Sequence, residues 1–492
     1  MAIPSSQSSP HFSSVLAELR SVVGAAGVLS EPDEMLVYES DGFSVAKGMP
    51  TAVIFPTDTQ QVSRCLKILA RHNIPIVPRG SGTGLAGGAV AYGEGVIVST
   101  TRMTRVESID IPNRVALVQA GVRNIALSEA VALAGAPDLH FSPDPSSQRA
   151  STIGGNAATN AGGINTLKHG VTVNHILGME FVTPDGTIHI ARGQSLHDGV
   201  GPDITALFCG SEGVLGLVTR LWCRLVPKPK HYRTFYAVYD TTLDACKTVS
   251  DVIAKGIIPT SMEMMDGSMI RVVEDAFHYG FPTTAQALLL IEIDGIESIL
   301  DEQLDRIVQI ARDNHATDVQ QCSDPKRRME LWSARKKAFG AIGRISHSYC
   351  TQDACVPRSM LPDVMVKVLA IGQKYGLKIP NVFHAGDGNI HPILLFDEAD
   401  PEQVQCILLA SKEILEYCID IGGTLTGEHG VGVEKIHLMS RMFTPATLAA
   451  FMQIKLAFDP HQRCNDAKLI PSDKLTIELL RPVSRNVAGG AA

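Results

Sequence analysis

The first regular pattern along the chain is a short apolar run followed by an amphipathic one. Residues 52–55 are apolar, residues 57–60 read Thr-Asp-Thr-Gln, and apolar positions then recur at helical spacing over residues 62–70. Capping residues followed by such spacing predict a helix. A second apolar run at residues 74–77 follows the helix. The segment therefore predicts two parallel strands joined by a right-handed helical crossover.

The pattern changes after residue 228, where Lys-Pro-Lys at residues 228–230 suggests a domain boundary. Apolar or alternating runs now alternate with longer amphipathic segments, and the glycine content falls. The predicted elements are strands at residues 232–239 and 287–293 and helices at residues 243–258, 299–314 and 402–420. This order predicts an α+β domain built on a sheet.

A glycine-rich loop follows the second predicted strand. Residues 78–88 read PRGSGTGLAGG and contain a literal GxGxxG at residues 82–87. A Rossmann fingerprint must join the first strand of a βαβ unit to its helix, whereas this loop leads into another apolar run at residues 96–99. Its successive backbone N–H groups can still form a nest for a pyrophosphate.

Two further glycine-rich stretches strengthen the case for a nucleotide cofactor. Residues 151–163 read STIGGNAATNAGG, and residues 210–216 read GSEGVLG. Small residues over so many positions allow a flat ring or a diphosphate to approach the backbone closely.

With FPTDTQQV, PDPSS and GMEFVTPDG, these motifs make residues 50–228 similar to the FAD domain of the vanillyl-alcohol oxidase and p-cresol methylhydroxylase family. The resemblance implies a two-part FAD-binding domain and an extended FAD. It assigns to the pyrophosphate Arg79, Gly80, Ser81, Gly82, Thr83, Gly84 and Leu85. It assigns to the flavin ring and ribityl chain Pro143, Ser151, Thr152, Gly154, Gly155 and Gly163, and to the adenine end Glu212, Gly213 and Gly216. Many relatives attach the flavin through a histidine of the first loop, which this chain lacks, so noncovalent FAD is expected.

The densest polar motifs lie near the C-terminus. HAGDGNIH at residues 384–391 places two histidines seven positions apart, and GEHG at residues 427–430 adds a carboxylate and a third histidine. Two histidines and one carboxylate are typical of an open site for a divalent ion. The alternative is that these histidines only form hydrogen bonds with a substrate.

HAGDGNIH and TGEHGVGVEK also resemble the C-terminal domain of FAD-linked oxidases, whose members oxidise glycolate, D-lactate or D-2-hydroxyglutarate. The resemblance implies that His384, His391 and Glu428 bind zinc or manganese and that His429 is the general base. Asn389 is a weaker candidate for a substrate contact. Arg335, in LWSARKK, resembles the family's substrate arginine, although a solvated basic helix face is the alternative. Arg358 is a weaker second candidate.

The expected reaction is the oxidation of a small D-2-hydroxy acid by hydride transfer to the flavin. Hydroxyglutarate enzymes carry Asn where this chain has Ile393, so glycolate ranks first and D-lactate second. The resemblance further implies a flavin-like and an iron–sulfur partner subunit, with quinone or a cytochrome as the final electron acceptor. A non-catalytic flavoprotein subunit and an oxidase that uses O₂ directly are alternatives.

The expected organisation is an FAD-binding domain at residues 1–228, a substrate or cap domain with an antiparallel sheet at 229–431, and a C-terminal segment at 432–492 that returns to the FAD domain. One departure from relatives is Cys464-Asn465-Asp466-Ala467-Lys468, where they usually read Asn-Pro-Gly-Lys. The loss of Pro and Gly is expected to loosen a turn near the flavin.

Charge and composition narrow the range of partners and compartments. The net charge of −8 argues against nucleic acid, and the basic run at residues 326–328 is interpreted as a solvated helix face. None of the ten cysteines forms a CxxC motif, so no iron–sulfur site is expected. The cysteines are expected to be reduced thiols. No apolar run reaches the ~20 residues of a membrane helix. A cytoplasmic protein is expected, and docking on a membrane through a partner stays open.

Overall fold

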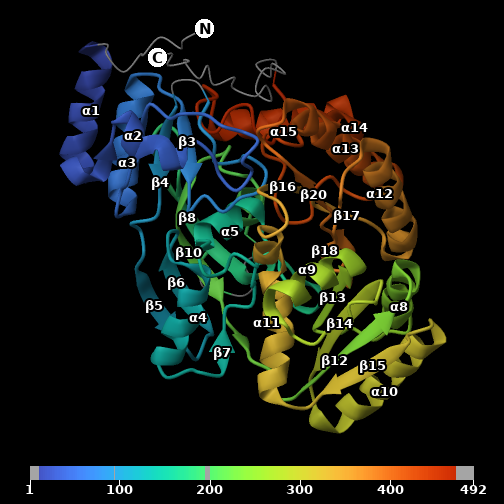
Figure 1. Ribbon diagram of the computed structural model, residues 1–492. Helices are drawn as coiled ribbons and strands as arrows, with labels where there is room; N and C mark the ends of the chain where they lie inside the picture. The colour runs from blue at the N-terminus through green and yellow to red at the C-terminus, as the bar shows by residue number, and fades with distance from the viewer. Residues whose placement is uncertain (1–9, 93–94, 194, 196–199, 473–492) are drawn as a thin grey trace, which may run out of the picture.

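A computed structural model describes residues 10–92, 95–193, 195 and 200–472. Figure 1 shows an N-terminal half, coloured blue to teal, beside a second half that runs from green through yellow to orange. The last helices return to the upper part of the N-terminal half. The chain therefore folds as α+β, as its pattern predicts.

The first sheet of the N-terminal half has the strand order β1-β2-β4-β3. Its strands are β1 (Val28–Leu29), β2 (Ala52–Ile54), β3 (Ile76–Arg79) and β4 (Val96–Ser99). The two predicted strands, β2 and β3, are parallel members of one sheet, and β4 lies between them and pairs with both.

Helix α3 (Thr59–Arg71) joins β2 to β3, as the sequence predicts. The Asp58 carboxylate caps it by accepting the backbone N–H of Gln61 at 2.9 Å. Its apolar face packs in the core around this sheet, together with α1 (Pro10–Val23).

The second sheet of the N-terminal half is antiparallel, in the order β5-β6-β10-β8-β9. Its strands are β5 (Val106–Asp110), β6 (Val115–Gln119), β8 (Ile176–Val182), β9 (Ile188–Ala191) and β10 (Leu217–Arg224). The helices of this part are α4 (Asn124–Leu133), α5 (Ile153–Thr159), α6 (Thr166–His169) and α7 (Ile204–Phe208), and β7 (Leu139–His140) pairs with β11 (Val226–Pro227). Helix α5 lies on the side of this part that faces the second half (Figure 1).

The second half is built on a five-stranded antiparallel sheet in the order β15-β12-β14-β13-β18. Its strands are β12 (Tyr232–Tyr239), β13 (Ser261–Asp266), β14 (Ala287–Asp294), β15 (Asp318–Cys322) and β18 (Val382–Phe383). Helices α8 (Thr242–Ala254) and α10 (Glu297–Asp313) cover one face, and α9 (Gly267–Phe277) and α11 (Pro325–Ile342) cover the other. Alternate side chains of β12 enter the two cores, which the period of two requires.

Further elements of the second half and the C-terminal segment surround this sheet. They are β16 (Ser348–Thr351) paired with β20 (Ile393–Phe396), β17 (Ala354–Cys355) paired with β19 (Asn389–Ile390), and helices α12 (Leu361–Tyr375), α13 (Pro401–Asp420), α14 (Met439–Met442) and α15 (Pro445–Phe458). Helices α12 and α13 lie on the side away from the N-terminal half (Figure 1). The predicted helix at 402–420 is α13.

The C-terminal segment contacts the N-terminal half at several points. Cys464 forms an isolated parallel bridge with Ile76, and the side chain of Asn465 donates to the carbonyl of Glu212 at 2.6 Å. The backbone of Ala467 lies in the left-handed region, with φ of 61°. The domain limits at residues 228 and 431 stay predictions.

All ten cysteines lie in the described part of the chain and are free thiols. The described helices include none that is both long enough and apolar enough to cross a bilayer.

Candidate active site

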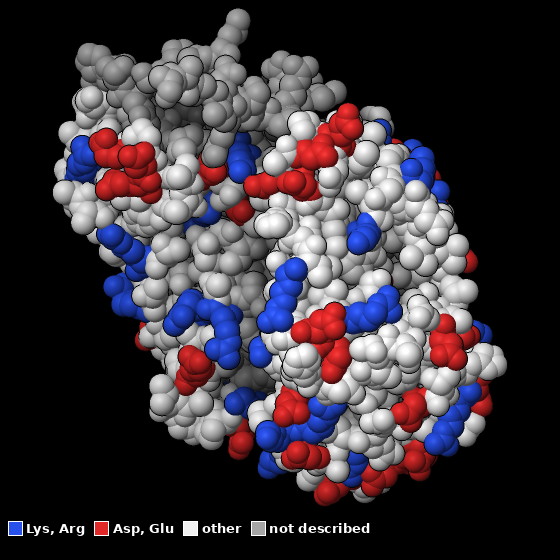
Figure 2. Space-filling view, viewed as in Figure 1, with Lys and Arg blue, Asp and Glu red and all other residues white. Residues whose placement is uncertain are grey.

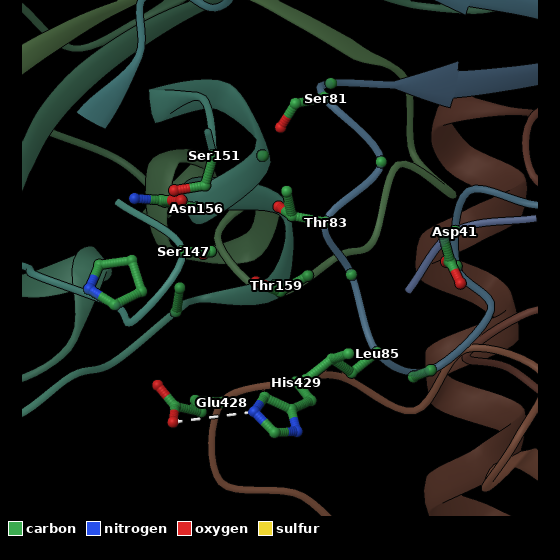
Figure 3. A pocket seen from close by; sticks show the side chains of 18 of the residues that line it. Asp41, Ser81, Thr83, Leu85, Ser147, Ser151, Asn156, Thr159, Glu428 and His429 are labelled. Carbon is green, nitrogen blue, oxygen red and sulfur yellow. Dashed lines mark ion pairs between the residues drawn. The ribbon is translucent and has the colours of Figure 1, made fainter. Parts of the chain in front are cut away.

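A cavity of about 370 Å³ lies between the two halves, and its walls come from both. One wall is the glycine-rich loop after β3, and the facing wall begins at α5. Figure 3 shows Ser81 and Thr83 on the loop opposite Ser151, Asn156 and Thr159. Glu428 and His429 lie at another side of the same cavity (Figure 3). The cavity thus joins the glycine-rich motifs to the histidine motifs.

Most residues predicted to bind FAD line this cavity or a smaller neighbour. The main cavity is lined by Gly80, Ser81, Gly82, Thr83, Gly84, Leu85, Ser151, Thr152, Gly155 and Glu212. A second cavity of about 60 Å³ shares Gly80, Gly155 and Glu212 and adds Arg79, Gly154, Gly213 and Gly216. Pro143 and Gly163 line neither. The two cavities together provide one elongated, backbone-rich space for a dinucleotide.

The loop after β3 has little room for side chains. Gly82 and Gly87 both have a φ of 74°, which favours glycine. A methyl group at Gly80 would come within 2.6 Å of the Thr152 hydroxyl, at the start of α5. The Arg79 guanidinium donates to the Ala89 carbonyl at 3.2 Å, so it links the two ends of the loop. These contacts hold the loop against α5 with its backbone toward the cavity.

The three predicted metal ligands come together at one side of the cavity. His384 Nε2 and His391 Nε2 lie 3.2 and 3.4 Å from the same oxygen of Glu428. All three are buried, and their candidate ligand atoms lie within 4.8 Å of one another. Neither ring nitrogen of His391 has a hydrogen-bond partner in the described part of the chain. Two imidazoles and a carboxylate at this spacing fit a divalent ion.

The ring of His384 is held by Glu263, which the sequence reasoning missed. Glu263 lies on β13, accepts from His384 Nδ1 at 2.7 Å and binds Arg335 Nε of α11 at 2.6 Å. Burial opposes the protonation of His384, but the carboxylates of Glu263 and Glu428 raise its pKa well above 6.5. A carboxylate behind a histidine is the usual second contact of a metal-binding imidazole.

The turn that carries Glu428 and His429 is organised by Asp353, which was also missed. One oxygen of Asp353 accepts the N–H groups of Gly427 and His429 at 2.9 and 3.0 Å. Burial opposes the charge, but the buried ammonium of Lys435, 3.4 Å away, holds the pKa of Asp353 well below its usual value. The charge on Asp353 therefore stabilises the backbone that presents both site residues.

The same turn is fixed to the N-terminal half. The second oxygen of Glu428 accepts the N–H of Gly162 at 3.0 Å. The carboxylate of Glu212 accepts the N–H groups of Val431 and Gly432 at 2.6 and 2.7 Å. Glu212 is thus placed between the glycine-rich walls and the catalytic turn, and its predicted role at the adenine end stays a prediction.

His429 is held in the unprotonated form that a general base needs at neutral pH. Its ring stacks on that of His391, with centroids 4.8 Å apart and 14° between the planes. Burial lowers the pKa of His429 to about 4, so the ring is neutral at pH 7. Its Nδ1 has no partner among the described residues. A neutral imidazole beside an acidic cluster can act as a general base.

The structure places the other predicted residues at different distances from the cavity. Arg335 is 1% exposed and lies behind the lining, and its two terminal nitrogens have no hydrogen-bond partner among the described residues. Asn389 is buried beside Gly427 and does not line the cavity. Arg358 lines a separate hollow with Asp387. The basic run at residues 326–328 is only partly a solvated face, since Arg328 binds buried Glu292 at 2.6 Å.

Several lining residues carried no signal in the sequence. Near His391 the wall also includes Lys336, Phe339, Tyr349 and Thr351. They lie on α11 and β16, 33 to 48 positions before HAGDGNIH, and only Lys336 stands in a quoted motif, next to Arg335 in LWSARKK. Glu263, which lies behind the lining, carried no distinctive signal either, because β13 reads SMEMMD and holds a second acid, Asp266.

Comparison with known proteins supports both halves of this description. Residues 50–192 match the FAD binding domain family, and residues 228–469 match the C-terminal domain of FAD linked oxidases. Glycolate oxidase subunit GlcD of Escherichia coli (strain K12) is 42% identical over 93% of this chain and 91% of its own length. D-lactate dehydrogenase of Archaeoglobus fulgidus is 31% identical over 85% of this chain and 91% of its own. The structure of p-cresol methylhydroxylase with substrate bound is 16% identical, with a TM-score of 0.78 over 95% of this chain and 98% of that chain, which shows the shared fold.

Proposed function

Because this chain belongs to the FAD-linked oxidases, we propose that it oxidises a small 2-hydroxy acid to the 2-oxo acid, with glycolate as the first candidate and D-lactate as the second. The chain is an FAD-dependent oxidoreductase. One observation carries the proposal: a single cavity is lined both by the glycine-rich loops and by His391, Glu428 and His429. A cofactor in the first part of the cavity and an acid in the second would therefore meet.

The glycine-rich walls suit noncovalent FAD. Gly80 and Gly82 present backbone with no side chain in the way, and the side chains of Ser81, Thr83 and Ser151 add hydroxyl donors. Bound FAD supplies an oxidant that accepts a hydride from carbon 2 of the substrate. The loop of residues 80–85 holds no histidine, so acid precipitation of the holoenzyme should leave the yellow colour in the supernatant.

The buried cluster of His384, His391 and Glu428 suits zinc or manganese. The unpartnered ring nitrogens of His391 and the Glu263–His384 contact are the observations that support a metal here. A bound ion would supply positive charge to the carboxylate and hydroxyl oxygens of the substrate and lower the pKa of the hydroxyl. Without an ion, the protonated ring of His384 brings the pKa of Glu428 down to about 2, although burial opposes its charge, and a bound ion would take the place of that proton.

His429 and Arg335 are proposed to act directly on the acid. His429 is neutral at pH 7 and would take the hydroxyl proton at a ring nitrogen as the hydride leaves. Arg335 holds Glu263 through Nε, and its two unpartnered terminal nitrogens are suited to a carboxylate. For Asn389, packed against Gly427, the proposed role is a contact near the substrate.

The choice of glycolate rests on two observations. Ile393 is buried in β20, at the position where hydroxyglutarate enzymes carry Asn, so an extra carboxylate has no polar partner from this residue. The chain is also 42% identical to a glycolate oxidase subunit and 31% identical to a D-lactate dehydrogenase. By analogy with the subunit, partner subunits would carry the electrons onward to quinone or a cytochrome.

Anaerobic reduction of the flavin tests the proposal. The holoenzyme is mixed without oxygen with glycolate, D-lactate, L-lactate, D-2-hydroxyglutarate, D-malate or D-2-hydroxybutyrate, and the absorbance near 450 nm is followed. Bleaching by glycolate or D-lactate at the highest second-order rate is the expected result. If no 2-hydroxy acid bleaches the flavin, the proposed function is wrong. Peroxide release in air at the same rate would instead indicate an oxidase.

A further inference from the structure

We call the cavity between the two halves, where FAD is proposed to bind, the flavin cavity. A second hollow, which we call the outer cleft, adjoins it. It has a volume of about 710 Å³, and its walls come from both halves of the chain. Arg149 lies on the N-terminal wall, and Arg328 and Lys337 of α11 lie on the facing wall. Ser146 and Lys336 line both the outer cleft and the flavin cavity. These two residues therefore stand between the two hollows.

The junction carries a polar pair that spans the halves. Lys336 Nζ lies 3.3 Å from an oxygen of Asp144, and the other oxygen of Asp144 accepts the N–H of Asn165 at 3.3 Å. The Lys336 side chain is 31% exposed, so it is wetted and not sealed in the core. An ammonium held by one ion pair at a wet junction can exchange that partner for another carboxylate.

The outer cleft has a surplus of positive charge. Its three acids are each paired: Asp144 with Lys336, Glu292 with Arg328, and Asp294 with Lys168. Arg149 and Lys337 are exposed, and neither forms an ion pair within the described part of the chain. Figure 2 shows blue side chains on both sides of the groove between the halves. This local surplus runs against the net charge of −8 and would attract small anions.

The position of the junction determines what can pass through it. Lys336 and the neighbouring Phe339 line the flavin cavity together with His391, on the side where the acid must bind. A dinucleotide along the glycine-rich walls would leave this side to the substrate. The junction therefore leads from solvent to the reacting end and not to the adenine end.

From this arrangement we infer that the outer cleft is the access route for the substrate anion, with Arg149 and Lys337 attracting it and Lys336 receiving it at the junction. The identity of the anion rests on the proposed function, whereas the route does not. Arg149 and Lys337 belong neither to the lining of the flavin cavity nor to the proposed metal cluster.

Stopped-flow flavin reduction of the holoenzyme tests the attraction. Arg149→Gln/Lys337→Gln should lower the second-order rate constant for glycolate about five-fold at an ionic strength of about 0.01 M, and hardly at all at about 0.3 M. The limiting rate at saturating acid should not change. Lys326→Gln/Arg312→Gln, which removes two exposed charges outside the cleft, is the matched control. An equal loss in both double variants would show a general charge effect and overturn the inference.

A steric variant tests the outer cleft itself. Gln148→Trp, at a position that lines the outer cleft and not the flavin cavity, should lower the same rate constant at both ionic strengths, because the indole obstructs the cleft, and the FAD content should stay at one per chain. Unchanged access in Gln148→Trp would place the route elsewhere.

Quenching of flavin fluorescence separates the route from the choice of substrate. Iodide should quench the Arg149→Gln/Lys337→Gln variant about two- to three-fold less efficiently than the unmodified protein at low salt, whereas neutral acrylamide should quench both equally. This result would support the route even if no hydroxy acid bleached the flavin. Equal iodide quenching in the two proteins would contradict the route even if glycolate were the substrate.

Discussion

The carboxylate of Asp353 accepts the backbone N–H of His429 at 3.0 Å, so a buried charge fixes the position of the proposed base. The same oxygen accepts from Gly427, and Lys435 neutralises the charge from 3.4 Å away. Asp353 is not among the described residues that line the cavity. It is a positioning residue, whose loss should affect the turn and not the cofactor.

We predict that Asp353→Asn lowers kcat about 10–100-fold, as is usual for residues that orient the groups at a metal site. An amide offers a single uncharged oxygen to the N–H groups that the carboxylate now satisfies. The FAD content, read from the 450 nm to 280 nm absorbance ratio, should stay normal. Asp363→Asn, on the exposed side of α12, is the control. A normal kcat in Asp353→Asn would show that the turn holds without this charge.

His429→Ala should keep the flavin and lose turnover. General-base catalysis typically contributes about 10²–10⁴ in rate, and the loss should fall in that range. Steady-state kinetics and anaerobic flavin reduction measure it. His437→Ala removes an exposed imidazole eight positions away and should behave like the unmodified protein. Near-normal reduction of the flavin in His429→Ala would remove His429 from the mechanism.

Removal of the proposed metal should slow the reaction without releasing the cofactor. After dialysis against a strong chelator, flavin absorbance should persist, and reduction by glycolate should slow on the order of 10²–10³-fold. Added Zn²⁺ or Mn²⁺ should restore it. His384→Gln should be slow with or without added metal, since one ligand is missing. Full activity in protein that elemental analysis shows to be metal-free would contradict the proposed metal site.

Acid should destabilise the fold through His175. Its ring is 2% exposed, and burial lowers its pKa to about 4, against 6.5 for an ordinary imidazole. Between pH 6.5 and pH 4 the unfolded chain binds a proton that the folded chain rejects, so stability falls as the pH falls through this window.

We expect His175 to account for about 2 kcal/mol of the stability lost between pH 7 and pH 5. Urea unfolding at both pH values should show a smaller loss in His175→Gln, whose amide can still donate to the His169 carbonyl. His347→Gln replaces an exposed imidazole and should leave the loss unchanged. The same loss in both variants would show that His175 does not cause it.

Ala467→Gly should stabilise the protein. The backbone of Ala467 has a φ of 61°, a conformation that costs a residue with a Cβ roughly 1–2 kcal/mol. The more flexible unfolded chain of the glycine variant offsets part of the gain, so we expect about 0.5–1 kcal/mol in urea unfolding. Ala450→Gly, at an exposed position in α15, should instead destabilise by about 1 kcal/mol. A loss of stability in both variants would show no strain at Ala467.

The sequence predicted best the elements whose pattern is local. Strand β12 has the bounds that its apolar alternation predicted, and the Asp58 cap marks the start of α3. The apolar run at residues 96–99 is strand β4, but the pattern gave no sign that it lies between β2 and β3, since strand order is set by packing across the sheet. Nor did it predict helix α5, whose two glycines disfavour helix; the Thr152 cap and packing against the second sheet override that preference.

The site was predictable only in part, because its supporting contacts join residues that are far apart in the sequence. HAGDGNIH and GEHG identified His384, His391 and Glu428, and the structure brings their ligand atoms together. Glu263 and Asp353 lie more than 70 positions away from the side chains and turn that they hold. An acid within a strand that belongs to no motif gives no indication of its partner, so the pairing becomes visible only when the chain is folded.

A cavity whose walls belong to both halves has a thermodynamic consequence. FAD held between the first glycine-rich loop and the His391–His429 side would bridge the halves, and its binding free energy would then be added to the free energy that keeps them together. Protein made in cells short of riboflavin should therefore populate a looser, protease-sensitive form, and resupply of the vitamin derivative should rescue it. In this enzyme the supply of the cofactor would set how much of the chain survives as well as how fast each copy works.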